Sequence, residues 1–176
     1  AILKQKFQNL KLILKDQSNL YDKKAEEYLD MIKTTKYGKY LNIDVINDII
    51  FISKNLDLIS LNRLYNLTDC YVSPYRAEGF NLPPLEAAAV GTPIIVTKGG
   101  STDDYFHPSL GLQIDSVQFE KNDSRKVEPK MDSLIECIER IILNPNNFGQ
   151  IKGSQFIQNN YNWKIITNQL YKVFNE

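Results

Sequence analysis

Two glutamates, Glu78 and Glu86, are separated by seven residues that include a glycine and a pair of prolines. A carboxylate can accept hydrogen bonds from two adjacent hydroxyl groups, and ribose and hexoses present such a diol. Gly79, directly after Glu78, allows the backbone to approach a ligand closely. Taken singly, each glutamate is equally consistent with a solvated surface carboxylate. Taken together, they indicate a site for a sugar or a nucleotide.

The segment around these glutamates predicts a strand, a loop, a helix and a second strand. Two apolar runs flank a segment of helix-forming residues: Cys70–Ser73, Ile94–Thr97 and, between them, Leu82–Val90. Pro83 and Pro84 suit the first turn of a helix, where a missing N–H group is tolerated. A strand, helix and strand of this length form a parallel crossover, and ligands bind at the carboxyl ends of such strands. The loop that carries Glu78 therefore lies beside a helix N-terminus, which favours a phosphate.

This stretch resembles the EGF-x5-EA signature of GT-B glycosyltransferases, specifically the large retaining family 4. The match consists of Glu78-Gly79-Phe80, then Glu86-Ala87 at the family's spacing, and then Gly91-Thr92-Pro93. In that family, the first glutamate contacts the donor sugar and the second binds the ribose hydroxyls of the nucleotide. Backbone amides that follow the first glutamate hold the sugar or the diphosphate. The resemblance covers nearly all of the chain.

Carried over to this chain, the resemblance implies one catalytic residue, Glu78, and eight residues that bind the donor substrate: Glu86, Gly79, Phe80, Asn81, Leu82, Gly99, Gly100 and Asp103. Many members have glycine where this chain has Asn81, a departure that concerns the geometry of the third amide. Gly99-Gly100 occupies the place of a Gly-Gly-x-x-Glu segment in many members, and Asp103 replaces its glutamate with a shorter carboxylate.

The composition describes an ordinary globular chain. It has 176 residues, of which 43% are hydrophobic and 24% are charged, and its net charge is zero. This length and hydrophobic content suit one domain with a real core, and a neutral chain gives no bulk electrostatic attraction to nucleic acid. No apolar run approaches the roughly 20 residues of a membrane span. Cys70 and Cys137 are expected to be free thiols of a reduced compartment, so we expect a cytoplasmic protein, with membrane contact through a further domain left open.

Strands and helices alternate along the chain, which predicts an α/β fold with a Rossmann-like, doubly wound parallel sheet. Besides the segments above, we expect helices at Ala1–Leu10, Tyr21–Lys36 and Leu58–Leu67, and strands at Lys11–Lys15, Ile49–Ser53 and Leu110–Ile114. We expect Gln118–Val127 to be a surface loop and residues 129–176 to be a helical tail.

The donor half of GT-B enzymes opens with a strand and a loop that carries an arginine and a lysine, and neither precedes Ala1. The resemblance therefore implies that residues 1–176 are a C-terminal nucleotide-sugar-binding domain without its first strand and basic loop. The last helix, at Tyr161-Asn162-Trp163, resembles the family helix that crosses back towards the N-terminal domain. That N-terminal domain, which holds most of the acceptor site, is an expected partner.

Other polar residues fit structural roles better than chemical ones. Arg76 could reach a phosphate, but a solvated loop arginine is the preferred interpretation. Asp103-Asp104 lacks the Asp-x-Asp spacing that metal-dependent glycosyltransferases use, and His107 is the single histidine, so we expect no metal site. No Gly-x-Gly-x-x-Gly follows a strand, which disfavours a dinucleotide-dependent oxidoreductase.

The resemblance implies retaining transfer of a glycosyl unit from a nucleotide-diphosphate sugar to a hydroxyl of a glycan, lipid or protein acceptor. Electrostatic stabilisation of the leaving diphosphate would then carry most of the catalysis, with no metal or other cofactor. We expect this segment alone to be inactive, because half of the cleft is absent. The alternative is a degenerate GT-B half that binds a nucleotide or a partner without turnover.

Overall fold

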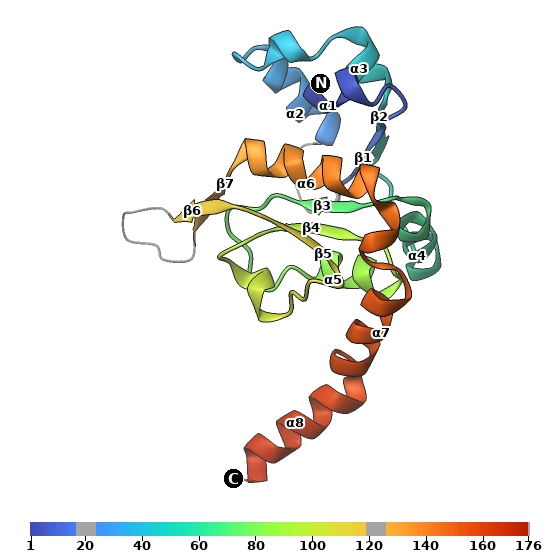
Figure 1. The fold of residues 1–176 in the computed structure, drawn as a ribbon, viewed down its shortest axis with the longest axis vertical. Helices are drawn as coiled ribbons and strands as arrows, with labels where there is room; N and C mark the ends of the chain where they lie inside the picture. Colours follow the sequence, from blue (N-terminus) through green and yellow to red (C-terminus); the bar gives the residue numbers. More distant parts are fainter. Residues whose placement is uncertain (17–23, 119–125, 176) are drawn as a thin grey trace. The chain divides into compact units, whose positions relative to one another are not determined.

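The computed structural model describes residues 1–16, 24–118 and 126–175. Contacts within the chain divide it into two compact units, Ala1–Asp57 and Leu58–Glu176. Both units contain helices and strands, and the two-stranded sheet of the first unit and the three-stranded sheet of the second are parallel (Figure 1). The expected α/β class with parallel strands and C-terminal helices is therefore confirmed.

The first unit contains a parallel pair of strands, β1 (Leu12–Lys15) and β2 (Ile49–Ile52), which pair from Leu12 with Ile49 to Lys15 with Ile52. Its helices are α1 (Ile2–Lys6), α2 (Ala25–Lys33), η1 (Gly38–Tyr40) and α3 (Ile43–Asn47). The expected helix at Tyr21–Lys36 is confirmed over α2, and residues 21–23 lie outside the described residues. The short helices η1 and α3 were not expected from the sequence pattern.

Asp16, directly after β1, joins the elements of the first unit. Its Oδ2 atom accepts hydrogen bonds from the backbone N–H of Ala25, 2.8 Å away at the start of α2, and from Ser53 Oγ, 3.0 Å away after β2. No described residue of this unit is fully buried, although many are half-buried. Backbone pairing, a few polar contacts and the half-buried apolar side chains of β1 and β2 therefore hold the first unit together.

The second unit is built on the sheet β3-β4-β5, whose strands are Tyr71–Ser73, Ile94–Thr97 and Gly111–Ile114. All four residues of β4 are fully buried, because β4 is paired on both sides and covered on both faces. Figure 1 shows α5 (Leu82–Ala89) below this sheet and α6 (Met131–Leu143) above it. The remaining helices of the unit are α4 (Leu58–Leu67), η2 (Ser101–Asp104), η3 (Pro145–Asn147), α7 (Gln150–Asn160) and α8 (Trp163–Asn175).

Two apolar clusters fill the faces of this sheet. One contains Ile94 and Val96 of β4 with Tyr65, Ala87 and Ala88 of the helices α4 and α5. The other contains residues from three elements: Ile95, Leu112, Ile114, Cys137 and Ile141. The alternation of Ile94, Ile95 and Val96 between the two clusters is the two-residue period of a strand. Tyr71 and Val72 of β3 pack against these two clusters, and the candidate site begins just beyond the carboxyl end of β3.

The prediction of a loop over Gln118–Val127 is wrong at both ends of the segment, where the structure has strands. Strand β6 (Ser116–Gln118) pairs antiparallel with β7 (Val127–Pro129), and Gln118 lies opposite Val127. Residues 119–125 of the expected loop lie outside the described residues. Strands of three residues leave too short a pattern to recognise, and the flanking charged residues favoured a loop. The helical tail is confirmed from Met131 onwards as α6, α7 and α8, with η3 between α6 and α7, whereas Pro129 belongs to β7.

Candidate functional site

The connection between β3 and α5 brings the signature residues to the carboxyl end of β3. Glu78, Gly79 and Phe80 are exposed, whereas Asn81 is buried, with 8% of its surface exposed. A methyl group on Gly79 would meet no atom within 4 Å, so the space beside this backbone is open. Parallel sheets place ligands at this end of their strands. The position of the loop therefore suits a ligand that contacts its backbone.

Asn81 has the left-handed backbone conformation, with φ 64° and ψ 67°. Glycine and asparagine tolerate this conformation better than other residues, which explains how Asn81 can replace the glycine of many family members. Its side-chain Nδ2 donates to Ser73 Oγ at 2.9 Å, and its carbonyl accepts a hydrogen bond from the Tyr105 hydroxyl at 2.8 Å. The pKa of Tyr105 is raised, mainly by burial, so this hydroxyl remains protonated and donates the hydrogen bond. The turn before α5 is thus held from both sides.

The N-terminus of α5 offers fewer N–H groups than an ordinary helix. Pro83 and Pro84 occupy its first turn and have no N–H, and Asn81 makes no side-chain cap. Leu82 supplies the N–H of the first helical position. An anion at this site would therefore be bound by the amides of Leu82 and of the preceding loop residues.

Glu86 is exposed on the second turn of α5, and the chain supplies it with a partner. The Tyr65 hydroxyl of α4 donates a hydrogen bond to Glu86 Oε2 at 3.0 Å. Burial, and then the hydrogen bond to Glu86, raise the pKa of Tyr65 well above its ordinary value. Tyr65 therefore presents a protonated hydroxyl to the carboxylate over the physiological pH range. Glu86 as a whole stays exposed to solvent, so the pair lies at the surface of the chain.

Asp103 and the two glycines before it form a turn with its own hydrogen bonds. Asp103 Oδ2 accepts from the backbone N–H of Gly99 at 2.9 Å, and Oδ1 accepts from Gln113 Nε2 at 2.6 Å. Both carboxylate oxygens thus have protein partners. A Cβ atom on Gly100 would lie 2.7 Å from the Tyr75 hydroxyl, so glycine is needed for this close approach.

Tyr75 joins this turn to the loop that carries Glu78. Its hydroxyl lies 2.8 Å from Thr102 Oγ1 and 3.1 Å from the Thr97 carbonyl, and it accepts a hydrogen bond from the Thr102 backbone N–H at 3.1 Å. The loop after β3 and the turn after β4 are therefore one connected structure.

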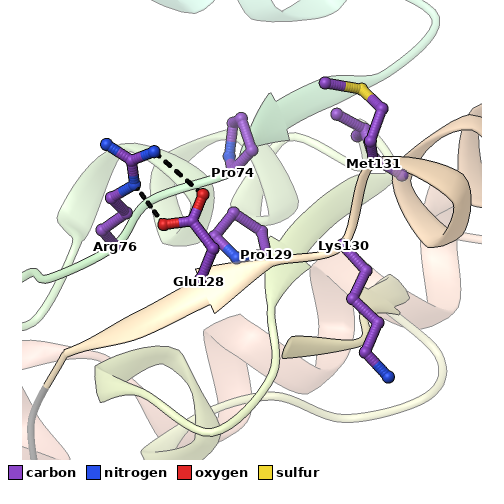
Figure 2. A pocket seen from close by; sticks show the side chains of 7 residues that line it. Pro74, Arg76, Glu128, Pro129, Lys130 and Met131 are labelled. Atoms are coloured by element: carbon purple, nitrogen blue, oxygen red, sulfur yellow. Dashed lines mark hydrogen bonds and ion pairs between the residues drawn. The ribbon is translucent and has the colours of Figure 1, made fainter. Parts of the chain in front are cut away.

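Arg76 pairs with a residue that the sequence analysis did not single out. Its Nε and Nη2 atoms donate to the two carboxylate oxygens of Glu128 on β7, at 2.5 and 2.8 Å (Figure 2). This hydrogen bonding lowers the pKa of Glu128. The Arg76 carbonyl also accepts a hydrogen bond from the Val127 backbone N–H at 2.8 Å. The pair borders a pocket of about 330 Å³ that is lined by Pro74, Arg76, Glu128, Pro129, Lys130, Met131 and Leu134.

The residues that sequence reasoning missed are partners in side-chain hydrogen bonds between distant parts of the chain. Tyr65 and Glu86 are 21 positions apart, and Arg76 and Glu128 are 52 positions apart. No local pattern marks such pairs. His107 has the structural role that was expected. Its ring stacks on the Phe156 ring, with the ring centroids 4.5 Å apart, and its Nδ1 accepts a hydrogen bond from the Ser109 backbone N–H. Across the described ranges, no three His, Cys, Asp or Glu side chains are grouped to hold a metal ion.

Comparisons with solved structures identify the fold. The C-terminal domain of a glycosyl transferase group 1 family protein, LpcC from Francisella tularensis, matches 92% of this chain with a TM-score of 0.61 at 19% identity, and 75% of that chain is covered. Sucrose-phosphate synthase from Thermosynechococcus elongatus matches 94% of this chain with a TM-score of 0.66 at 22% identity, over 38% of its own length. The chain therefore has the fold of a GT-B C-terminal domain.

The family profile described as "Glycosyl transferases group 1" matches residues 1–163. The chain belongs to this family. It is similar to a protein named putative glycosyltransferase 63 from Sulfolobus islandicus filamentous virus, at 32% identity over 62% of this chain and 38% of that protein. It is also similar to an uncharacterised protein of Sulfolobus islandicus rod-shaped virus 1, at 29% identity over 63% of this chain and 32% of that protein. The chain thus spans about a third of the length of these relatives.

Within the parts of the chain that the structure describes, no helix combines the length and the apolar character needed to cross a membrane.

Proposed function

We propose that residues 1–176 are the donor-binding domain of a retaining glycosyltransferase that uses a nucleotide-diphosphate sugar. Membership of the group 1 family supports the reaction class. The observation that carries the donor assignment is the position of Glu86, whose carboxylate is exposed on α5 and held at one oxygen by Tyr65. Such a carboxylate suits the two adjacent hydroxyls of a ribose.

In this proposal, the loop before α5 binds the remainder of the donor. The amides of Gly79, Phe80, Asn81 and Leu82 take the diphosphate or the sugar, and Glu78 orients the transferred sugar. Backbone N–H groups whose positions are fixed before the reaction stabilise the negative charge that develops on the leaving diphosphate. Gly99, Gly100 and Asp103 shape the neighbouring turn, and Tyr75 connects that turn to the loop. We assign no metal or other cofactor to this scheme.

The complete transferase would also need an acceptor site and a basic loop for the diphosphate. We propose that both belong to segments outside residues 1–176, and that the acceptor site lies in an N-terminal GT-B domain. The acceptor is a hydroxyl of a glycan, a lipid or a protein. The expected result for this chain alone is donor binding without sugar transfer, which an assay with labelled nucleotide sugars and common acceptors checks.

The two glutamates provide the test of donor binding. Loss of a charged hydrogen-bond partner costs roughly 1.5–3 kcal/mol, or about one to two decades of affinity. Glu86→Gln should weaken binding of a bare nucleoside diphosphate and of its nucleotide sugar alike. Glu78→Gln should weaken binding of the sugar-bearing form and leave the bare diphosphate unchanged. Isothermal titration of both variants with both ligands measures these four affinities.

Glu136→Gln is the matched control, because Glu136 is an exposed helical glutamate on α6 and has no role in the proposal. Equal weakening of the bare diphosphate by Glu78→Gln and Glu86→Gln would contradict the division of roles. No binding of UDP, GDP or ADP by the parent chain would favour the alternative, a degenerate module that recognises a partner.

A further inference from the structure

The carboxylate of Glu86 is directed by a hydroxyl that belongs to a different helix. Glu86 is exposed, and an exposed glutamate samples several rotamers because three side-chain bonds rotate. Here the Tyr65 hydroxyl donates to Glu86 Oε2 at 3.0 Å. A hydrogen bond at this distance restricts the carboxylate to the rotamers that keep Oε2 beside Tyr65. The protein thereby engages Oε2, while Glu86 as a whole stays exposed.

Tyr65 is itself fixed by contacts that do not involve Glu86. Its side chain and backbone together are 7% exposed, and its ring meets the Tyr71 ring edge-on, with the ring centroids 5.8 Å apart. Its backbone carbonyl accepts hydrogen bonds from Thr92 Oγ1 at 2.8 Å and from Thr68 Oγ1 at 2.9 Å. The fold thus sets the position of the hydroxyl, and the flexible glutamate follows it.

A carboxylate oriented in this way suits a ligand that presents two hydroxyl groups at a fixed separation. An ionised carboxylate has about four acceptor positions, and Tyr65 uses one of them. Recognition of a cis-diol needs two of the others to face the ligand together. A freely rotating carboxylate would have to be ordered when the ligand binds, and this ordering weakens binding.

We propose that Tyr65 is a positioning residue of the ribose subsite, which holds Glu86 in the orientation that accepts hydrogen bonds from both the 2′ and the 3′ hydroxyl. This inference rests on the proposed function, because it takes Glu86 as the ribose ligand. It adds a selectivity: the Tyr65–Glu86 pair favours ribonucleotides over 2′-deoxyribonucleotides. A role confined to core packing would not distinguish these two ligands.

The test is a double-mutant cycle with two ligands. The parent, Tyr65→Phe, Glu86→Gln and the double variant are titrated with whichever of UDP, GDP and ADP binds most tightly, and with its 2′-deoxy form. Tyr65→Phe keeps the ring and removes the hydroxyl, so it should weaken the ribonucleotide about 3- to 10-fold, the range of one net hydrogen bond. It should weaken the deoxy form less, which lowers the ratio of the two affinities. In the Glu86→Gln background, where the charge of the acceptor is gone, Tyr65→Phe should have a smaller effect than in the parent.

Tyr171→Phe is the matched control, because Tyr171 is exposed on α8 and the same atom is removed. Melting curves establish that each variant is folded. If Tyr65→Phe weakens both ligands equally, leaves both unchanged, or adds its full effect to that of Glu86→Gln, Tyr65 has no positioning role, although the proposed function stands. If the parent binds no diphosphate or Glu86→Gln has no effect, the donor assignment fails and this inference fails with it.

Discussion

The two units of this chain bury their strands to very different degrees. In the second unit, β4 lies between β3 and β5 and all four of its residues are fully buried. In the first unit, β1 pairs with β2 alone and no described residue is buried. A two-stranded sheet is marginal by itself, whereas a central strand with both faces covered gains both pairing and apolar burial. The second unit is therefore expected to hold most of the stability of the chain.

The candidate donor site lies in the second unit, which is expected to be the more stable of the two. Glu78, Glu86, Gly99, Gly100 and Asp103 all belong to Leu58–Glu176. The loop with Glu78 and the helix α5 with Glu86 follow β3, and the turn with Gly99, Gly100 and Asp103 follows the buried strand β4. Donor binding should therefore depend strongly on changes in the second unit and weakly on changes in the first.

The largest expected effect comes from Gly111 of β5. A Cβ atom there would lie 1.8 Å from the Ile94 carbonyl oxygen, a backbone atom of the central strand. Gly111→Ala should therefore displace β5 from β4 and cost about 4 kcal/mol or more of stability, the range of severe core substitutions. Urea denaturation monitored by circular dichroism measures this loss.

Gly38→Ala is the comparison in the first unit, where the added Cβ would lie 2.1 Å from the Lys33 carbonyl oxygen. It should disturb the first unit and leave the rate of amide hydrogen exchange in β4 unchanged. Gly79→Ala is the neutral control, because nothing lies within 4 Å of the added atom. Loss of protection in β4 after Gly38→Ala would show that the two units unfold together, contrary to the comparison.

A smaller effect is expected at Asn81, which tests the turn before α5. Alanine in the left-handed conformation costs about 1–2 kcal/mol relative to residues that tolerate it. Asn81→Ala also removes the hydrogen bond to Ser73, so it should lower the free energy of unfolding by about 2 kcal/mol. Asn81→Gly loses the same hydrogen bond but keeps the backbone conformation, so its change should stay within about 1 kcal/mol. Urea denaturation of both variants decides this, and equal losses would mean that the backbone conformation is not the reason for asparagine here.

Sequence reasoning succeeded where the signal was local. Helix α4 has the expected bounds, Leu58–Leu67, and α5 begins at Leu82 because the following prolines favour a first helical turn. The fold class followed from the alternation of such segments. The family resemblance marked the loop at Glu78, and the structure places that loop at the carboxyl end of β3.

The same reasoning failed where the cause lies in tertiary structure. The partners of Glu86 and Arg76 are Tyr65 and Glu128, and their pairing depends on how helices and strands pack. The hairpin of β6 and β7 depends on pairing between segments of three residues each, which carry no usable period. The loop residues were thus predictable, and the side chains that fix them were not.

The smallest expected effect concerns the ion pair between Arg76 and Glu128, which joins β7 to the loop before Glu78. The pair is bidentate but lies at the surface, so water and salt screen it. Its hydrogen bonds lower the pKa of Glu128 below the ordinary value of 4.5. A carboxyl group whose pKa is lowered on folding stabilises the folded state above its unfolded pKa, and this contribution disappears as the pH falls through the folded pKa.

Glu128→Gln should therefore lower the melting temperature slightly at pH 7, by less than Asn81→Ala does. The difference from the parent should shrink below pH 4.5. Melting curves of both proteins between neutral and acidic pH, at low and high salt, measure it. A difference that stays constant over this range would mean that Glu128 contributes by packing instead of by its charge.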